Sequence, residues 1–177
     1  MAFSKIIAES MDLTDTYAFT GTVTGAGGAN TPAFMAYMSA DQSSVSDNVW
    51  TKPNMNTEFF DTDSKYDTSN YRFTPTVSGK YMFCANLLLS NATNQMNGCS
   101  IAFYKNGTKL LYNERVMSGL GGTEDVVDLT GIIDLDTDDY VEIYVKADID
   151  SGGTYTINQD GTTSNNRCYW YGYKIIT

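Results

Sequence analysis

Carboxylates and thiols are the side chains of this chain that could do chemistry, because histidine is absent. With no His among 177 residues, the chain lacks the commonest general base, the commonest metal ligand and the usual activator of a nucleophile. The pairs Glu58 with Asp61 and Asp63 with Asp67 have the residue types that cleave glycosides, although acidic turns are a commoner use of such residues. We therefore predict that the protein is not an enzyme, and glycan cleavage stays open as an alternative.

Patterns that hold metals or phosphates are incomplete. The acidic run 134–139 begins like a calcium loop, but the EF-hand pattern needs Gly at its sixth position and Glu at its twelfth, where this chain has Asp139 and Val145. The Gly-rich segments 25–28 and 119–122 lack the Lys-Ser/Thr ending of a phosphate-binding loop. We expect an acidic turn at 134–139 and no cofactor.

The cysteines are predicted to be buried, reduced thiols. Cys84, Cys99 and Cys168 lie within apolar segments and form no Cys-x-x-Cys pair. An odd, scattered set of this kind is typical of free cysteines in a protein core.

The charge balance excludes several partners. Lys and Arg total 11 against 21 Asp and Glu, which gives a net charge of -10. Such a surface repels phosphate backbones and anionic lipids, so we expect neither nucleic-acid binding nor membrane insertion. The first residues place Glu9 and Asp12 where a signal peptide needs hydrophobic side chains, which predicts a protein made and assembled in the cytoplasm.

The elements that must position these side chains are predicted to be strands. Tyr, Thr, Gly and Asn lie between short apolar runs, and Asn106-Gly107 predicts a tight hairpin because both positions tolerate a positive φ. We expect an all-β jelly-roll sandwich of about ten strands. The candidate strands are 33–38, 48–60, 70–74, 79–89, 99–105, 108–117, 124–135, 139–147, 153–158 and 167–176.

Several of these strands carry large side chains on both faces. Alternation along 79–89 places one apolar set on a core face: Tyr81, Phe83, Ala85, Leu87 and Leu89. The second face of that strand also holds Met82, Cys84 and Leu88, and on 167–176 Tyr169, Tyr171 and Tyr173 share a face. A monomeric sandwich needs one apolar face for each sheet, so the pattern predicts self-association, with ordinary Tyr-rich solvent faces as the alternative.

The order of these residues resembles the signature of the complement C1q globular-head family, relatives of the tumour necrosis factor trimers. The matching positions are Asp61, Tyr66, Phe73 and Gly79-x-Tyr81-x-Phe83, and the resemblance extends over residues 32–177. Two positions depart from the pattern: Met55 stands in place of Phe and Ala85 in place of an aromatic residue. Because both are apolar, we expect the same fold.

The resemblance implies a parallel three-fold trimer with aromatic contacts along its axis. We assign to that interface Tyr81, Met82, Phe83, Tyr144, Tyr169 and Tyr171. Some members of the family bind calcium near the axis through loop carboxylates. The corresponding calcium candidates are Glu124, Asp125, Asp148 and Asp150.

Residues 1–31 differ from the rest and are predicted to form an arm and a Gly-rich linker. The segment DLTDTYAFTGTVTG is similar to segments of bacteriophage tail-fibre and other virion appendage proteins. The alternative is a chain terminus that has no binding partner. We expect the arm to attach the domain 32–177 to a particle through Ile6, Ile7, Leu13, Tyr17 and Phe19.

These features together predict a virion structural protein. It would be a trimeric head on a phage appendage that attaches to a host-surface glycan or protein, as a tail-fibre tip anchored through the arm. Capsid decoration or a head fibre is the first alternative, and a cellular lectin-like or cytokine-like binding module is the second. Recognition is expected in the loops 90–97, 118–124 and 148–166, because loops on a rigid sandwich commonly carry binding.

Overall fold

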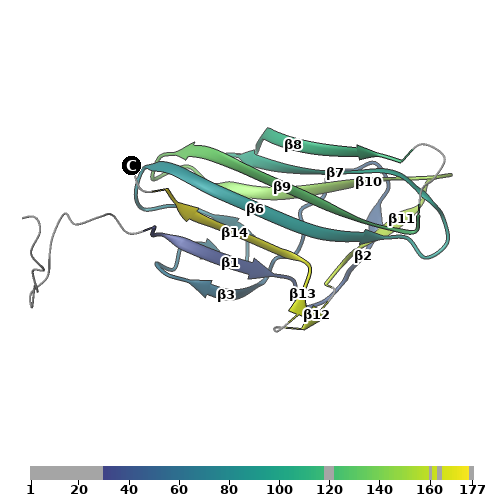
Figure 1. Cartoon of the computed structure of the whole chain (residues 1–177), viewed down its shortest axis with the longest axis horizontal. Helices are drawn as coiled ribbons and strands as arrows, with labels where there is room; N and C mark the ends of the chain where they lie inside the picture. Colours follow the sequence, from purple (N-terminus) through teal and green to yellow (C-terminus); the bar gives the residue numbers. More distant parts are fainter. Residues whose placement is uncertain (1–29, 118–121, 160, 163–164, 176–177) are drawn as a thin grey trace, which may run out of the picture.

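The chain folds into two antiparallel β-sheets packed face to face (Figure 1). The structure is a computed structural model that describes residues 30–117, 122–159, 161–162 and 165–175, and these residues contain no helix. The predicted all-β jelly roll is therefore confirmed. Residues 1–29 lie outside the described part of the chain, and so do the predicted attachment residues of the arm.

The larger sheet has seven strands and is built around β6 (Gly79–Ser90). Along one edge β6 pairs with β9 (Glu124–Leu135), from Gly79 opposite Leu135 to Ser90 opposite Glu124. Its other edge pairs with β14 (Tyr169–Lys174) and, further along, with β11 (Thr154–Asn158). The sheet is completed by β1 (Ala33–Tyr37) and β3 (Thr57–Asp61) beyond β14, and by β2 (Gln42–Ser46) beyond β11. We call it the large sheet.

The second sheet, which we call the small sheet, has five strands in the order β4, β5, β10, β7, β8. Their bounds are β4 (Tyr66–Asp67), β5 (Arg72–Phe73), β10 (Val141–Ile149), β7 (Met96–Lys105) and β8 (Thr108–Val116). The turn between β7 and β8 has φ of 51° at Asn106 and 75° at Gly107, which confirms the predicted hairpin. A separate pair joins β12 (Gly161–Thr162) to β13 (Asn165–Asn166).

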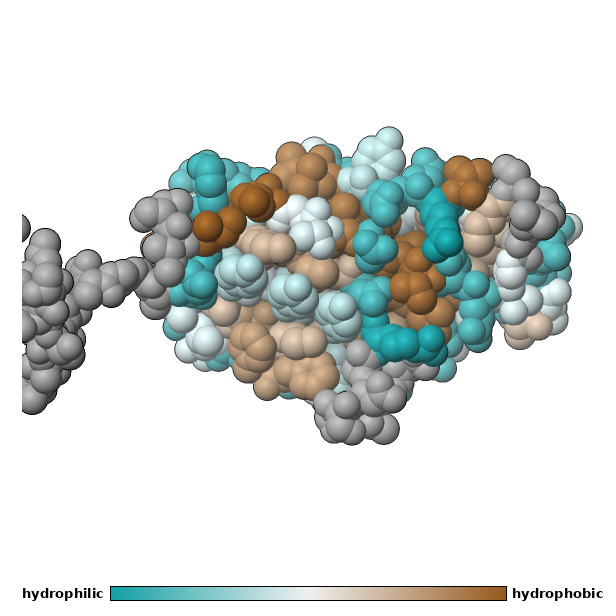
Figure 2. Space-filling view, viewed as in Figure 1, coloured by the Kyte–Doolittle hydropathy of each residue, from teal (hydrophilic) through white to brown (hydrophobic). Residues whose placement is uncertain are grey.

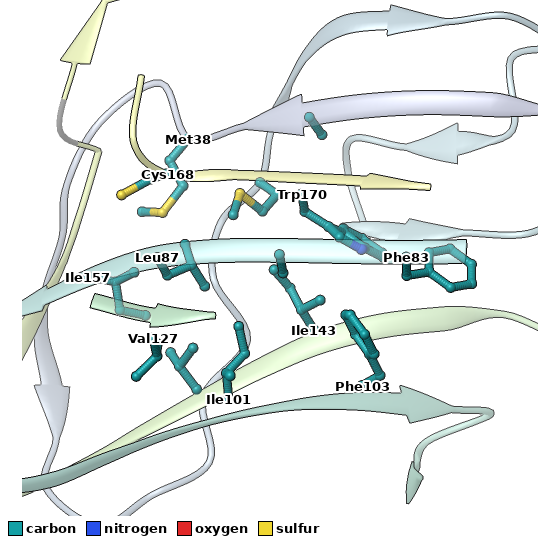
Figure 3. Packing of buried hydrophobic residues seen from close by; sticks show 14 of the residues in the cluster. Met38, Phe83, Leu87, Ile101, Phe103, Val127, Ile143, Ile157, Cys168 and Trp170 are labelled. Atoms are coloured by element: carbon teal, nitrogen blue, oxygen red, sulfur yellow. The ribbon is translucent and has the colours of Figure 1, made fainter. Parts of the chain in front are cut away.

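The core fills the space between the two sheets with alternate side chains of the central strands (Figure 3). Trp170 on β14 lies edge-on to Phe34, with ring centroids 4.9 Å apart, and Phe83 on β6 meets Phe103 on β7 at 6.0 Å. Burial of each such ring contributes about 1.5–3 kcal/mol to folding. The apolar substitutes Met55 and Ala85 are both fully buried, so the departures from the family pattern are core residues.

The three cysteines are free, as predicted. Cys99 and Cys168 are buried, and Cys84 is half-buried. Burial first, and then the neighbouring Asp125 carboxylate, raise the pKa of the Cys99 thiol to about 12, so this thiol stays protonated and unreactive.

The predicted strand 48–60 is wrong over most of its length. Only 57–61 pairs in the large sheet, because Asn48 has a φ of 56° and Pro53 has no N–H to donate. The segment between them instead forms a single bridge from Thr51 to Val145 of β10. Strand β2 was not predicted, since Val45 is the one buried residue in its sequence QSSVS and the apolar signal is weak.

Candidate functional site

The outer face of the large sheet is the main candidate site, because many side chains that point away from the core on β1, β6 and β14 are aromatic or apolar. Alternation on β6, β14 and β1 turns the core residues inward and leaves a second set outside. We call this set the aromatic face: Met35, Phe60, Met82, Cys84, Ile132, Tyr169, Tyr171 and Tyr173.

Strand register brings the aromatic face together from segments far apart in the sequence. Phe60 lies opposite Met35, Met35 opposite Tyr171, and Tyr171 opposite Cys84, so one row crosses four strands. In the next row Tyr173 lies opposite Met82, which lies opposite Ile132. Figure 2 shows this side of the molecule: pale to brown residues cover much of the half over β1, β3 and β14, and strongly hydrophilic residues form a band to their right.

The polar atoms of the aromatic face are mostly engaged with each other. The Tyr173 hydroxyl donates a hydrogen bond to the Met82 sulfur at 3.1 Å, and the rings of Tyr169 and Tyr171 stack at 6.0 Å. A hydrogen bond with Cys84, followed by burial, raises the pKa of Tyr171 to about 12. Tyr171 therefore stays uncharged at neutral pH, which leaves the centre of the face without a formal charge.

One polar group next to the aromatic face lacks a partner. The side-chain oxygen of Asn86, on β6 opposite Tyr169, is buried and accepts no hydrogen bond within the described part of the chain. A buried acceptor left unpaired costs about 1–3 kcal/mol.

Comparison with solved structures identifies the fold. No protein-family description matches the sequence, and no curated protein matches it. Solved structures do match. The globular domain of zebrafish complement 1qA is 16% identical, with a TM-score of 0.52 over 82% of this chain and 98% of that one. An Eiger TNF from S. frugiperda has a TM-score of 0.56 at 9% identity, over 81% and 91% of the two chains. Murine APRIL has a TM-score of 0.53 at 12% identity, over 81% and 98%.

The fold is the C1q and tumour necrosis factor jelly roll. At these identities the likeness establishes the fold alone. The described residues contain no helix long and apolar enough to cross a membrane.

Three of the six residues that the sequence assigned to a trimer interface lie together on the aromatic face: Met82, Tyr169 and Tyr171. The assignment of Tyr81 and Phe83 to the interface is wrong. Both side chains point between the sheets and are fully buried in the protomer, so neither can contact a second copy. The Tyr81 hydroxyl donates to the carbonyl of Val77 at 2.6 Å, which satisfies the polar atom of a core residue.

Tyr144, also assigned to the interface, lies on the opposite side of the sandwich. It belongs to β10 and its ring packs against Tyr104 of β7 at 4.2 Å, on the outer face of the small sheet. Tyr144 is therefore not part of the aromatic face, and its place in an interface stays a prediction. The structure adds Met35, Phe60 and Ile132 to the aromatic face, and period-two alternation on 33–38 and 124–135 is the sequence signal that could have identified two of them.

The predicted calcium candidates are not brought together into a site. Asp125 accepts hydrogen bonds from Arg115 at 3.0 Å and from the Cys99 thiol at 3.3 Å, and Asp148 accepts one from Asn48 at 3.2 Å. Glu124 and Asp150 are exposed. Among the described residues no three His, Cys, Asp or Glu side chains are placed to hold a metal ion.

The acidic run and the carboxylates Asp61 and Asp67 support turns, as the simpler interpretation predicted, whereas Glu58 lies within strand β3. Asp61 accepts the N–H of Tyr66 at 2.7 Å, and Asp67 accepts those of Ser69 and Asn70 at 2.9 and 3.0 Å. Asp139 closes the turn after β9 by accepting the N–H of Asp136 at 2.7 Å. These carboxylates have structural roles in turns.

Proposed function

We propose that the protein is a homotrimeric binding head of a bacteriophage appendage, in which the aromatic face forms the contact between copies. The observation that carries the proposal is the aromatic face itself. An antiparallel sheet with one solvated side normally carries polar residues there, yet on this face Ile132 is 59% exposed and Phe60 is 48% exposed. A contiguous apolar surface of this kind is typical of an interaction site.

The chemistry of the aromatic face suits contact with a second copy of itself. Tyrosine offers a broad apolar ring and a hydroxyl that can bond across an interface, and uncharged rings can pack against each other without a desolvation penalty for charge. Closed symmetry brings the same surface of each copy to one axis.

The two ends of the sandwich suit a head carried on an arm. Strand β1 begins and β14 ends at the same end of the molecule, so residue 32, where the predicted arm joins, lies beside the C-terminal strand (Figure 1). The connections β6–β7 and β10–β11 lie at the opposite end. In this arrangement the arm faces the particle and the loops face the host.

The loops at the far end are held in place, which favours a binding role. Asn91 donates to the carbonyl of Thr154 at 2.5 Å and accepts the N–H groups of Thr93 and Asn94 at 2.8 and 2.7 Å. The N–H of Asp150 donates to the carbonyl of Gln95 at 2.8 Å, so the two connections support each other. Preorganised loops lose less entropy when a ligand binds. We infer a fibre tip that attaches to a host-surface glycan or protein.

The test is the location of the protein on its particle. Virions labelled with gold-conjugated antibody to residues 32–177 should show label at the ends of tail fibres, and a chain that lacks residues 1–31 should remain a soluble trimer but be missing from particles. Label over the capsid would instead support decoration. A protein absent from particles would overturn the virion role and leave the cellular binding module.

A further inference from the structure

We propose that the outer face of the small sheet binds an anionic saccharide that carries carboxylates, on a surface centred on Trp50. We call this surface the Trp50 platform: Trp50, Tyr104, Tyr112, Tyr144, Lys109 and Lys146. The proposal deepens the binding function proposed above. It places a ligand on a sheet face in addition to the loops, and on the side of the sandwich opposite the aromatic face.

The rings of the platform form one continuous group. The Trp50 and Tyr104 centroids are 6.4 Å apart, and Tyr104 and Tyr144 are 4.2 Å apart. Tyr112 lies across β7 from Tyr144, with Ala102 between them in the strand register, and is 58% exposed. Trp50, Tyr104 and Tyr144 are half-buried, so part of each ring remains open to a ligand.

Two lysines place positive charge against the rings of the platform. The Lys109 amine is 4.9 Å from the Trp50 ring centre and 4.8 Å from that of Tyr112, and the Lys146 amine is 5.8 Å from Trp50. Neither lysine has an ion-pair partner within the described part of the chain. Lys65 and Lys174 also lack one there, whereas five cations have one: Lys52, Arg72, Lys80, Lys105 and Arg115.

The chain has a net charge of -10, so acidic partners are plentiful. Two amines that lie over a tryptophan without an acidic partner leave a local positive charge inside a negative surface. Charge complementarity therefore points to an anionic ligand. At the edge of the platform the buried Glu142 is held by Lys52 at 2.6 Å, which neutralises that carboxylate, and Glu114 lies on the same face across β7 from Lys146.

The flat rings determine what kind of anion fits. Exposed aromatic rings stack well on the apolar C–H faces of sugar rings, and lysine binds a carboxylate as a point charge. A saccharide of acidic sugars offers a C–H face and a carboxylate on each sugar. A nucleic acid also offers rings and anions, but the negative net charge of the protein repels its closely spaced phosphates.

The test uses the full chain with two matched probes. Oligogalacturonate carries a carboxylate on each sugar, and its methyl ester has the same rings without charge. Titrations followed by tryptophan fluorescence should show that oligogalacturonate binds and the ester binds at least about tenfold more weakly, because the lysines are then left without an anion. Trp50 is half-buried while Trp170 is fully buried, so the signal change comes from the platform.

Variants separate the platform from the rest of the molecule. Trp50→Ala should lower the affinity, measured by calorimetry, at least about tenfold, and the double variant Lys109→Gln with Lys146→Gln by about as much. Trp50→Phe should retain most of it, since a ring remains. Lys80→Gln, which removes a cation on β6 of the large sheet, is the control and should bind like the wild type.

Several results would overturn the proposal. These are equal binding of the acid and its ester, no binding of the acid, an equal loss with Lys80→Gln, or tighter binding of a single-stranded oligonucleotide. The mass of each variant in solution is measured alongside. A variant that remains a trimer but loses the saccharide contradicts neither proposal, whereas a monomeric wild type that binds it contradicts the trimer alone.

Discussion

At the scale of single residues, the packing of two phenylalanine rings explains why β14 has a glycine, Gly172, between two tyrosines. A Cβ atom at this position would lie 2.5 Å from Cδ1 and 2.6 Å from Cε1 of Phe83, and 3.0 Å from Cε1 of Phe34. The absence of a side chain lets these rings lie flat against the strand. The sequence pattern predicts a glycine-containing strand here but cannot identify the rings, because they come from β1 and β6.

The substitution Gly172→Ala should lower the free energy of unfolding by about 1–3 kcal/mol, since an extra methyl group forces the packed rings apart. Urea denaturation followed by circular dichroism measures the difference. Gly122→Ala is the control, because a Cβ there would lie 3.5 Å from the nearest contact among the described residues, the carbonyl oxygen of Glu124. Equal urea midpoints for the two variants would contradict this prediction, because they would show that the rings around Gly172 can accommodate a methyl group.

Asp139 links two turns and gives the protein a defined response to acid. Its carboxylate accepts hydrogen bonds from the side chains of Lys105 and Asn106, each at 2.7 Å, and from the backbone of Asp136. The hydrogen bond from Lys105, first among these, lowers the pKa of Asp139 from its ordinary 3.8 to about 2. A depressed pKa means that the ionised group stabilises the fold above pH 3.8 and that this stability is lost as the pH falls toward 2.

We therefore predict that Asp139→Asn lowers the free energy of unfolding at neutral pH by about 1.5–3 kcal/mol, the range for a hydrogen bond to a charged group. The difference from the wild type should shrink between pH 4 and pH 2, as the wild-type carboxylate is protonated. Denaturant titrations across that range measure it. The exposed neighbour Asp138→Asn should change little, and a difference for Asp139→Asn that is independent of pH would contradict the assignment.

At the scale of elements, sequence patterns correctly predicted those features that depend only on residues close together in the chain. Alternation along 79–89 identified the core face of β6, and Asn106-Gly107 identified the hairpin, because each depends on residues close in sequence. The prediction of a strand over 48–60 neglected Pro53, which cannot donate to a sheet, and the bridge from Thr51 to Val145 joins residues far apart in sequence. The sheet to which Tyr144 belongs could not be predicted either, because it depends on distant partners.

If the aromatic face forms the trimer contact, a charge placed on it should dissociate the trimer. Tyr171→Glu would bury a carboxylate without a partner between copies, which costs several kcal/mol and should reduce the mass in solution from a trimer to a monomer. Tyr112→Glu, on the outer face of the small sheet, is the matched control and should remain a trimer. Sedimentation velocity distinguishes the species. A trimer that survives Tyr171→Glu would place the contact elsewhere.

At the scale of the whole molecule, the jelly roll separates three surfaces. The aromatic face lies on the outside of the large sheet, the Trp50 platform lies on the outside of the small sheet, and the connections β6–β7 and β10–β11 lie at the end opposite the start of β1 (Figure 1). A trimer closed through the aromatic face would leave a platform and a set of loops on each copy free. Each ligand contact would then be present three times, which increases avidity for a repetitive host surface.

The most direct test of the central claim is the mass of the full chain in solution. Light scattering after gel filtration at micromolar concentration should give about three times the chain mass of 19.5 kDa, because the aromatic face is covered when copies meet around an axis. A mass equal to that of one chain would contradict the account, since the exposed rings of the aromatic face would then have no partner.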